Sequence, residues 1–594
     1  MPPTVGFPGV LIEETTGGAH PIEGVATSIT AFIGRAWRGP TDEVIPIHSF
    51  GDFERAFGGL WVESTLGYAV RDFYLNGGRE AIIVRLFHPQ PASNSRLPDN
   101  TPLFVNGFAL EASEKGSWGG NLRFALDADV TDQDAAAIGF AKSEVFNLTV
   151  RELDANGAAL RTERFRSLTV VESARRVDTV LARESTLVRW SGPWPPSTLP
   201  SIAAIHAAQR ALTVARAANP QKPGAIAAAK AALDFIATDN ISRAEATLAA
   251  AQKVLSHAET AKVPVAADIE AARKAVNNKT AALAIAKNTS DGGALDADDF
   301  IGAGKMAAKE GLYSLEKADL FNVLCIPPYL PTGDADPALL GAAAVYCEKR
   351  RAMLLVDPPA AWTDVRAAIA GVAGLGTSSK NAALFFPRVS QPNPLRNDLV
   401  ERFVPCGAVA GVFARTDTQR GVWKAPAGRE ATLVGVAELS VPITADANSE
   451  LNRLGVNCLR SFPAAGHVVF GARTLQGDDR LASEWKFIPV RRTALFIEES
   501  LDRGLRWAAF EPNGEPLWAR IRSDVDTFML TLFRDGAFQG TKPQEAYFVK
   551  CGRDTTTDAD IDAGFINVLV GFAPLKPAEF VILRLVLVVA QVGS

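Results

Sequence analysis

The same alternation of short apolar strands and amphipathic helices occurs at two places in this 594-residue chain, and a long stretch of different character separates them. Residues 25–90 contain two strand-like segments, ATSITAFIGRA and EAIIVRLF, with two helix-like segments between them. From residue 300 the alternation resumes with NVLCIP, MLLVD and NAALFF as strands. Because strands that alternate with helices favour a largely parallel sheet, we expect one α/β body that is split across the chain.

Residues 104–190 change to an alternation of apolar and polar residues with period two, as in NLRFALDADV and FNLTVREL. The dipeptides Asn106-Gly107 and Asn156-Gly157 separate such runs and are typical of hairpin turns. This pattern predicts an inserted β-rich domain.

Residues 199–290 are unusually rich in alanine. Ser242 and Glu245 have the spacing of a capping box, and Ile241, Leu248 and Leu255 follow at heptad spacing. Three prolines, Pro220, Pro223 and Pro264, divide the segment into three or four helices. Alanine-rich helices with narrow apolar stripes form thin hairpins, so we expect an insertion that projects from the body.

Both chain ends contain strand-like segments. Residues 1–20 combine Gly and Pro with one apolar run, Val10-Leu11-Ile12, which Glu13 and Glu14 follow. Such a segment cannot bury itself, so we expect an extended arm. The last apolar run, EFVILRLVLVVA, is too short to span a bilayer and predicts a strand buried on both faces.

The expected fold class is multidomain α/β, or α+β overall. The predicted divisions are an N-terminal arm at 1–20, the first segment of the body at 21–90, the β-rich domain at 91–198, the alanine-rich insertion at 199–290, the second segment of the body at 291–480, a C-terminal α+β domain at 481–575 and a strand arm at 576–594.

The composition excludes several classes of protein. A net charge of −5 provides no basic field for nucleic acid, and a mean hydropathy of +0.07 argues against a polytopic membrane protein. The first residues do not resemble a secretory signal. The five cysteines are scattered, without a CxxC pair, which predicts buried free thiols in a reducing cytoplasm.

Motifs for catalysis or metal binding are incomplete. Gly304-Lys305 lacks the remainder of a phosphate loop, and Asp558, Asp560 and Asp562 lack the Gly and Glu of a calcium loop, so they predict an acidic loop or a helix start. The six histidines are dispersed, and the pair Arg491-Arg492 is interpreted as a local charge patch. We therefore assign no catalytic, cofactor-binding or metal-binding residue.

Two ordered groups of motifs resemble the tail sheath proteins of contractile phages and related contractile injection systems. The first group is PGVLIEE at Pro8–Glu14, PIEGVATSITAFIGRAWRGP at Pro21–Pro40, FERAFGG at Phe53–Gly59 and YAVRDFYLNGG at Tyr68–Gly78. The second is AGVFARTDTQRGVWKAPAG at Ala410–Gly428, LNRLGVNCLRSFPAAGHVVFGARTL at Leu451–Leu475 and FEPNGEPLW at Phe510–Trp518. Residues 201–288 depart from the family pattern.

The resemblance implies a subtilisin-like α/β core without enzymatic activity and without a cofactor. It implies hexameric rings that stack helically around an inner tube, together with baseplate and cap or terminator proteins as further partners. Nucleic acid binding and direct membrane insertion are not expected. Assembly in the bacterial cytoplasm, followed by one contraction that drives the tube through a target envelope, is the implied function.

An unpaired strand invites pairing with another chain. In a sheath we therefore expect arm contacts between subunits through Val10, Leu11, Ile12, Glu13, Val581, Leu583, Leu585 and Leu587, with pairing inside the same subunit as the alternative. The family also implies a helix that faces the tube. Residues 516–535 have an apolar stripe at helical spacing, and Arg522, Asp524, Asp526 and Arg534 lie largely off this stripe. These charges are expected to meet the tube, or to form a solvated face.

Two other functions stay open at this point. An α/β hydrolase or ligand-binding enzyme with a helical lid would have a deep polar pocket in which titratable groups converge. A secreted β-rich adhesin is disfavoured by the missing secretory signal and by the cysteine pattern.

Overall fold

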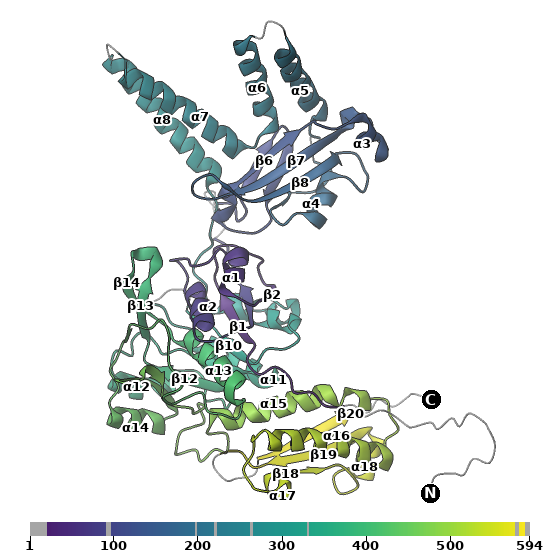
Figure 1. Ribbon diagram of the computed structural model, residues 1–594, viewed down its shortest axis with the longest axis vertical. Coiled ribbons are helices and arrows are strands. Elements are labelled where there is room, and N and C mark those ends of the chain that lie inside the picture. The colour runs from purple at the N-terminus through teal and green to yellow at the C-terminus, as the bar shows by residue number, and fades with distance from the viewer. Residues whose placement is uncertain are drawn as a thin grey trace, which may run out of the picture.

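An eight-stranded sheet forms the centre of the computed structural model, which describes residues 21–90, 97–196, 199–218, 222–261, 265–328, 332–575 and the backbone of 581–588 (Figure 1). Its six parallel strands are, in spatial order, β3 (Ala81–Arg85), β1 (Thr30–Gly34), β10 (Val323–Cys325), β11 (Met353–Val356), β12 (Ala382–Phe386) and β16 (Val456–Phe462). Antiparallel strands β2 (Val44–Ile47) and β17 (Gly466–Val469) complete the edges. Strand β1 pairs directly with β10, which confirms the α/β body split across the chain.

Both faces of the sheet are buried, as the near-continuous apolar strands require. One face packs against α1 (Phe50–Phe57), α2 (Leu66–Leu75) and α13 (Cys406–Arg420). The other face packs against α9 (Ala297–Ile301), α11 (Pro337–Lys349), α12 (Val365–Gly371) and α14 (Ala445–Arg453). Helices α2 and α13 touch through glycine, because a Cβ atom at Gly407 would lie 2.0 Å from the Ala69 carbonyl oxygen.

The expected β-rich domain lies beyond the body and consists of two three-stranded sheets. One contains β4 (Pro102–Val105), β5 (Phe108–Ala112) and β9 (Val188–Trp190), and the other β6 (Leu122–Asp127), β7 (Val145–Leu153) and β8 (Ala159–Thr169). Helices α3 (Asp132–Ala137) and α4 (Val177–Glu184) flank them. Asn106 and Gly107 both have positive φ between β4 and β5, as a tight hairpin turn requires.

Two antiparallel hairpins rise from this domain and form the end of the molecule farthest from the C-terminal domain (Figure 1). They are α5 (Ile202–Ala217) with α6 (Pro223–Ala237), and α7 (Asn240–Glu259) with α8 (Ala266–Lys287). Only their bases join the core of the β-rich domain, through Ile202, Ile205, Ala237 and Ile241. The alanine-rich segment thus forms two thin hairpins, which project from the β-rich domain and not from the body.

The expected capping box at Ser242 is wrong. Helix α7 begins three residues earlier, where the Asp239 side chain accepts a hydrogen bond from the Ser242 backbone N–H. Glu245 instead pairs with Arg123 of β6 and with Lys287 of α8. The Glu245 side chain, which the capping-box motif assigns to the start of the helix, forms ion pairs with other elements instead.

The C-terminal domain places two long helices over a three-stranded sheet. Helices α15 (Ile488–Gly504) and α16 (Glu515–Arg534) share a core with β18 (Tyr547–Lys550) and β19 (Phe565–Phe572), and β20 (Val581–Val588) pairs antiparallel with β19. Short helices α17 (Pro543–Ala546) and α18 (Asp558–Asp562) connect them. Helix α18 confirms the helix start expected at Asp558.

Helix α15 also attaches this domain to the body through a buried ion pair. Arg492 donates to both carboxylate oxygens of Asp417 on α13, at 2.8 and 2.6 Å, and both side chains are at most 4% exposed. Arg492 also donates to the Thr27 carbonyl oxygen at 2.8 Å, and the Thr27 hydroxyl donates to Asp417. The interpretation of Arg491-Arg492 as a local charge patch is wrong, because both side chains are buried and Arg492 pairs with a carboxylate of another helix.

We predict that Arg492→Met lowers the free energy of unfolding by about 3–5 kcal/mol, because it leaves the Asp417 carboxylate buried without its partner. The matched control is Arg420→Met on the same helix as Asp417, because the pair of Arg420 with Glu430 is exposed and contributes at most about 1 kcal/mol. Urea unfolding of both variants measures the difference. Equal losses in the two variants would contradict this role of the buried pair.

Candidate assembly surfaces

Helix α16 has one buried face and one charged face. The predicted apolar stripe is buried throughout, at Leu517, Ile521, Val525, Phe528 and Leu532. Gly514 caps the start, Pro516 lies in the first turn, and Gly536 with φ of +80° follows the end. The helix thus spans Glu515–Arg534, which is one residue earlier at both ends than the expected range 516–535.

The four charged residues singled out on this helix do not form one uniform surface. Asp526 and Arg534 are exposed, whereas Arg522 and Asp524 are partly buried. Arg522 is already engaged, since its guanidinium donates to the Cys551 carbonyl oxygen and pairs with Glu515 at 3.2 Å. Asp526 and Arg534 are therefore the members of this set that an external partner reaches most easily.

The C-terminal strand pairs inside its own chain. Strand β20 runs along the whole of β19, from Phe565 opposite Val588 to Phe572 opposite Val581. Sequence reasoning left open whether this arm pairs with another subunit or within its own chain. The structure shows pairing within the chain for the four residues named for this arm, Val581, Leu583, Leu585 and Leu587. Strand β20 is an edge strand of this sheet. Val10, Leu11, Ile12 and Glu13 lie outside the described residues.

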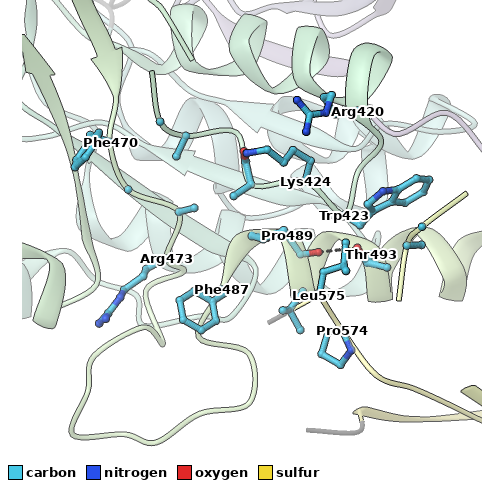
Figure 2. A pocket seen from close by; sticks show the side chains of 18 of the residues that line it. Arg420, Trp423, Lys424, Phe470, Arg473, Phe487, Pro489, Thr493, Pro574 and Leu575 are labelled. Carbon is cyan, nitrogen blue, oxygen red and sulfur yellow. Dashed lines mark hydrogen bonds between the residues drawn. The ribbon is translucent and has the colours of Figure 1, made fainter. Parts of the chain in front are cut away.

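A groove of about 920 Å³ lies where the body meets the C-terminal domain (Figure 2). Three aromatic side chains line it, Trp423, Phe470 and Phe487, with the basic residues Arg420, Lys424 and Arg473. Arg473 is held by Asp479 and by two backbone carbonyl oxygens, and the Thr493 hydroxyl donates to the Pro489 carbonyl oxygen at 2.7 Å. Among the described lining residues there is no His, Cys or Glu, and Asp535 is the one carboxylate.

Part of the edge of the sheet where α/β enzymes bind ligands is covered by the chain itself. In such sheets the binding crevice lies at the carboxyl ends of the strands where the strand order reverses, here beyond β1 and β10. Arg35, just after β1, donates to the carbonyl oxygens of Asp291 and Gly292 at 3.0 and 3.1 Å. Asp291 in turn accepts from the backbone N–H and hydroxyl of Ser117. Of the two crossings to the β-rich domain, the returning one lies beyond the ends of β1 and β3, where the Gly293 backbone N–H also donates to the His88 carbonyl oxygen at 2.8 Å.

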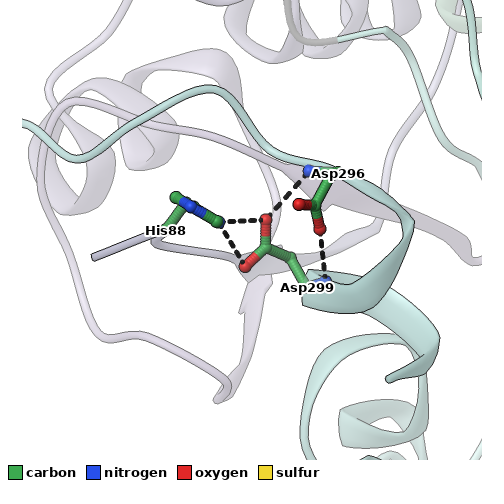
Figure 3. A group of neighbouring side chains, drawn as sticks. All are labelled: His88, Asp296 and Asp299. Carbon is green, nitrogen blue, oxygen red and sulfur yellow. Dashed lines mark hydrogen bonds and ion pairs between the residues drawn. The ribbon is translucent and has the colours of Figure 1, made fainter. Parts of the chain in front are cut away.

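Three possible metal ligands gather beside these crossings. The liganding atoms of His88, Asp296 and Asp299 lie within 4.8 Å of one another, and His88 Nδ1 is 2.9 Å from Asp299 (Figure 3). Both carboxylates already serve a capping box at the start of α9, where Asp296 and Asp299 each accept from the other's backbone N–H. Sequence reasoning missed the cluster because 208 residues separate His88 from Asp296. The capping role explains it without a metal.

The five cysteines are free and buried, as expected. Burial raises the pKa of the thiols of Cys325, Cys347 and Cys406, which keeps them protonated. A protonated, enclosed thiol is a poor nucleophile. The proximity of Asp357, which accepts from the Cys406 backbone N–H at 2.9 Å, therefore does not create an activated cysteine.

None of the described helices combines the length and the apolar character that crossing a bilayer requires.

Comparisons with known proteins agree on one family. The model of the phage tail sheath protein central domain matches residues 302–475, and that of the phage tail sheath C-terminal domain matches residues 482–587. A tail sheath protein of Vibrio phage KVP40 is 25% identical over 187 residues, which are 31% of this chain and 26% of that protein. A Pseudomonas aeruginosa protein described as a prophage major tail sheath protein is 26% identical over 254 residues, covering 42% of this chain and 61% of its own length.

The sheath tail protein Lin1278 from Listeria innocua has a similar fold. Its crystal structure superposes with a TM-score of 0.53 over 95% of each chain, at 12% identity. The chain thus spans less than two thirds of the length of the curated relatives it matches, whereas the similarity of fold extends over almost all of it.

A buried carboxyl in the body makes stability depend on pH. Asp72 on α2 is 3% exposed, and desolvation raises its pKa to about 6 although Arg71 and Gln391 oppose this. An unfolded aspartate has a pKa near 3.9. The folded protein therefore holds this proton more tightly, and its stability falls as pH rises from about 4 to 6.

We predict that Asp72→Asn removes this loss. Relative to the parent protein, the variant should gain stability between pH 4 and pH 7, by at most about 3 kcal/mol. Asp52→Asn is the control of opposite sign, because a hydrogen bond from the His48 backbone N–H lowers the pKa of Asp52. Thermal unfolding across this pH range measures both, and a constant difference for Asp72→Asn would contradict the prediction.

Proposed function

Since the chain belongs to the phage tail sheath family, we propose that it is the structural subunit of a contractile sheath. Copies form hexameric rings that stack helically around an inner tube, with baseplate and cap or terminator proteins at the ends. The sheath contracts once and drives the tube through a target envelope. The observation that supports this most is the match of two consecutive sheath domains, which together cover residues 302–475 and 482–587.

The fold is consistent with a subunit that transmits force and performs no chemistry. In this proposal the split parallel sheet is the subtilisin-like core of the family, and the domains of the chain divide at 20, 90, 198, 290, 480 and 575. The described lining of the groove has one carboxylate, Asp535, and no His or Cys, which does not favour the hydrolase alternative. Assembly takes place in the bacterial cytoplasm, and the product is a phage tail or a phage-tail-like particle.

Contraction in this proposal uses energy stored during assembly. The extended sheath is a kinetically trapped state, and better contacts between subunits become available after rearrangement. The arms connect subunits while their bodies rotate, because backbone hydrogen bonds between an arm and a neighbouring sheet survive such motion. In the single chain, β20 pairs along β19. In this proposal, the sheet of β18, β19 and β20 is the one to which an arm strand adds.

We predict that the purified full-length chain forms striated hollow tubes in electron micrographs. Deletion of residues 1–14 should leave a folded, soluble protein that no longer forms long tubes, because the arm that adds to a neighbour's sheet is lost. Circular dichroism checks that the deleted chain is folded. Discrete monomers of the full-length chain in every condition would argue against a sheath, and full-length tubes from the deleted chain would rule out strand exchange at this end.

The helix proposed to face the tube generates a second prediction. Asp526→Lys and Arg534→Glu reverse two exposed charges without touching the buried stripe. Each pair contributes at most about 1 kcal/mol, so each variant should lower the affinity for the inner tube by up to roughly fivefold per subunit.

The matched control is Asp268→Lys, which reverses an exposed charge on α8 at the opposite end of the molecule. Cosedimentation of sheath subunits with inner tubes measures the effect. Loss of binding by the α8 variant, or unchanged binding by both α16 variants, would show that α16 does not face the tube.

A further inference from the structure

Phe510, in the loop between α15 and α16, projects into solvent from a backbone conformation that such residues rarely adopt. Its φ is +75°, in the left-handed region, and its side chain is 72% exposed. Among the described residues it is the only large apolar one with a positive φ. A bulky residue in this region is an outlier, and such strain persists where the surrounding structure holds it, often at binding sites. The loop thus presents an aromatic side chain that its own chain leaves uncovered.

Contacts on both sides of Phe510 fix this loop. The Glu511 backbone N–H donates to the Ala508 carbonyl oxygen at 3.3 Å. The Asn513 side chain accepts from Nε1 of Trp518 at 2.9 Å, and Trp518 is buried in the core of the C-terminal domain. We call Phe510 together with Glu511 the knob. Because its loop is already held in place, the knob loses little conformational freedom when it binds a partner.

The groove between the body and the C-terminal domain has room for the knob. Its volume of about 920 Å³ is within the range of about 300–1,000 Å³ that holds drug-sized molecules. Its aromatic side chains, Trp423, Phe470 and Phe487, are all partly exposed (Figure 2). A further aromatic ring packs favourably against such rings in offset or edge-to-face geometry. The groove is therefore complementary to an exposed phenylalanine.

The knob and the groove also carry opposite charges that are unpaired within the described part of the chain. Glu511 is exposed and forms no ion pair there. Lys424 donates to the Ala425 carbonyl oxygen at 3.2 Å and pairs with no carboxylate there, Asp535 of the lining included. The two arginines of the groove, in contrast, are already paired with carboxylates. Lys424 is thus the cation that the groove offers to an incoming acidic group.

A single chain cannot place its own knob in its own groove. Pro489 and Thr493, in the first turns of α15, line the groove, whereas Phe510 follows the far end of this helix. Helix α16 begins just after the knob and ends where Asp535 and Gly536 line the groove. At a rise of 1.5 Å per residue, these helices of 17 and 20 residues separate the knob from the groove by about 25–30 Å.

We propose that the knob of one subunit docks into the groove of a neighbouring copy. The inference rests on the proposed sheath function and names a contact within it. Phe510 packs among the aromatic rings of the groove, and Glu511 pairs with Lys424. Because the two surfaces differ and lie at opposite ends of the same two helices, the contact is heterologous, and it joins copies head to tail around a ring.

The N-terminal arm is the competing occupant of the groove. It has an apolar run, Val10-Leu11-Ile12, followed by Glu13 and Glu14. In the proposed sheath this arm already adds as a strand to a neighbour's sheet, which uses its backbone groups. The knob has no other partner among the described residues and is already shaped to enter a pocket, so a second copy's knob is the occupant that these observations favour.

Carbodiimide crosslinking of assembled tubes tests the contact, because it joins a carboxylate and an amine that touch. Tubes are assembled from a mixture of isotope-labelled and unlabelled full-length chains, and mass spectrometry measures the crosslinks that join the two kinds of chain. Phe510→Ala removes the aromatic ring of the knob, and Phe510→Trp keeps one. Phe235→Ala is the matched control, because Phe235 of α6 is also largely exposed, at 65%.

We expect crosslinks between Glu511 and Lys424 of different chains in parent tubes. Phe510→Ala should lower their yield by roughly fivefold or more, because truncation of an aromatic anchor in a pocket typically costs more than 1 kcal/mol. Phe510→Trp and Phe235→Ala should keep the yield of the parent. Glu511→Lys combined with Lys424→Glu exchanges the two reactive groups and should restore the crosslink that each single reversal removes. Loss of tubes in Phe510→Ala alone, with unchanged circular dichroism, would also support the contact.

Three results would overturn the contact while leaving the sheath function intact. They are tubes without this crosslink, an unchanged yield in Phe510→Ala, and crosslinks from Lys424 to Glu13 or Glu14 in place of Glu511, which would assign the groove to the N-terminal arm. Failure of the parent chain to form tubes would instead overturn the sheath function itself, and the contact with it.

Discussion

The buried pair of Arg492 and Asp417 joins elements from three distant regions of the chain. Asp417 belongs to the α/β body, Arg492 to the first helix of the C-terminal domain, and Thr27, which contacts both, leads into β1. Two charges without solvent are stable only when their hydrogen bonds are complete, and here both carboxylate oxygens accept from Arg492 while Thr27 supplies a further bond. The body and the C-terminal domain are thereby held in one relative orientation. A subunit that transmits force to a neighbour requires such a rigid connection.

A second set of buried polar contacts attaches the outer domain. Arg85 is 1% exposed and donates to the carbonyl oxygens of Ala36, Gly39 and Lys115, while Arg35 holds Asp291 and Gly292. Burial lowers the pKa of Arg85 to about 10, so it stays charged at neutral pH. Arg85 thus connects the body to the β-rich domain at Lys115, and Arg35 connects it to the segment that returns from that domain at Asp291 and Gly292. The outer domain is therefore anchored at the carboxyl ends of β1 and β3.

The sequence predicted the elements better than their partners. Periodicity located the strands of the split sheet, and the prolines predicted three or four helices in the alanine-rich segment, where the structure has four, because these signals are local. Reasoning about Arg491-Arg492 and about the Ser242 capping box failed where a residue far along the chain competed for the same side chain: Asn381 for Arg491, Asp417 for Arg492, and Arg123 for Glu245. The apolar stripe of α16 could be predicted from its spacing. The hydrogen bond from Arg522 to the Cys551 carbonyl oxygen could not, because its acceptor lies 29 residues away in the chain. The proposed arm contacts between subunits concern an assembly, which a single chain does not contain.

The radial placement of the two ends of the subunit tests the account most directly. A helical reconstruction of the assembled particle by electron cryomicroscopy would locate α16 and the hairpins α5–α8 relative to the particle axis. We predict that α16 lies at the inner wall against the tube and that the hairpins lie at the outer radius, because they occupy opposite ends of the long axis of the chain (Figure 1). Hairpins at the inner wall, or α16 at the outer radius, would contradict the account.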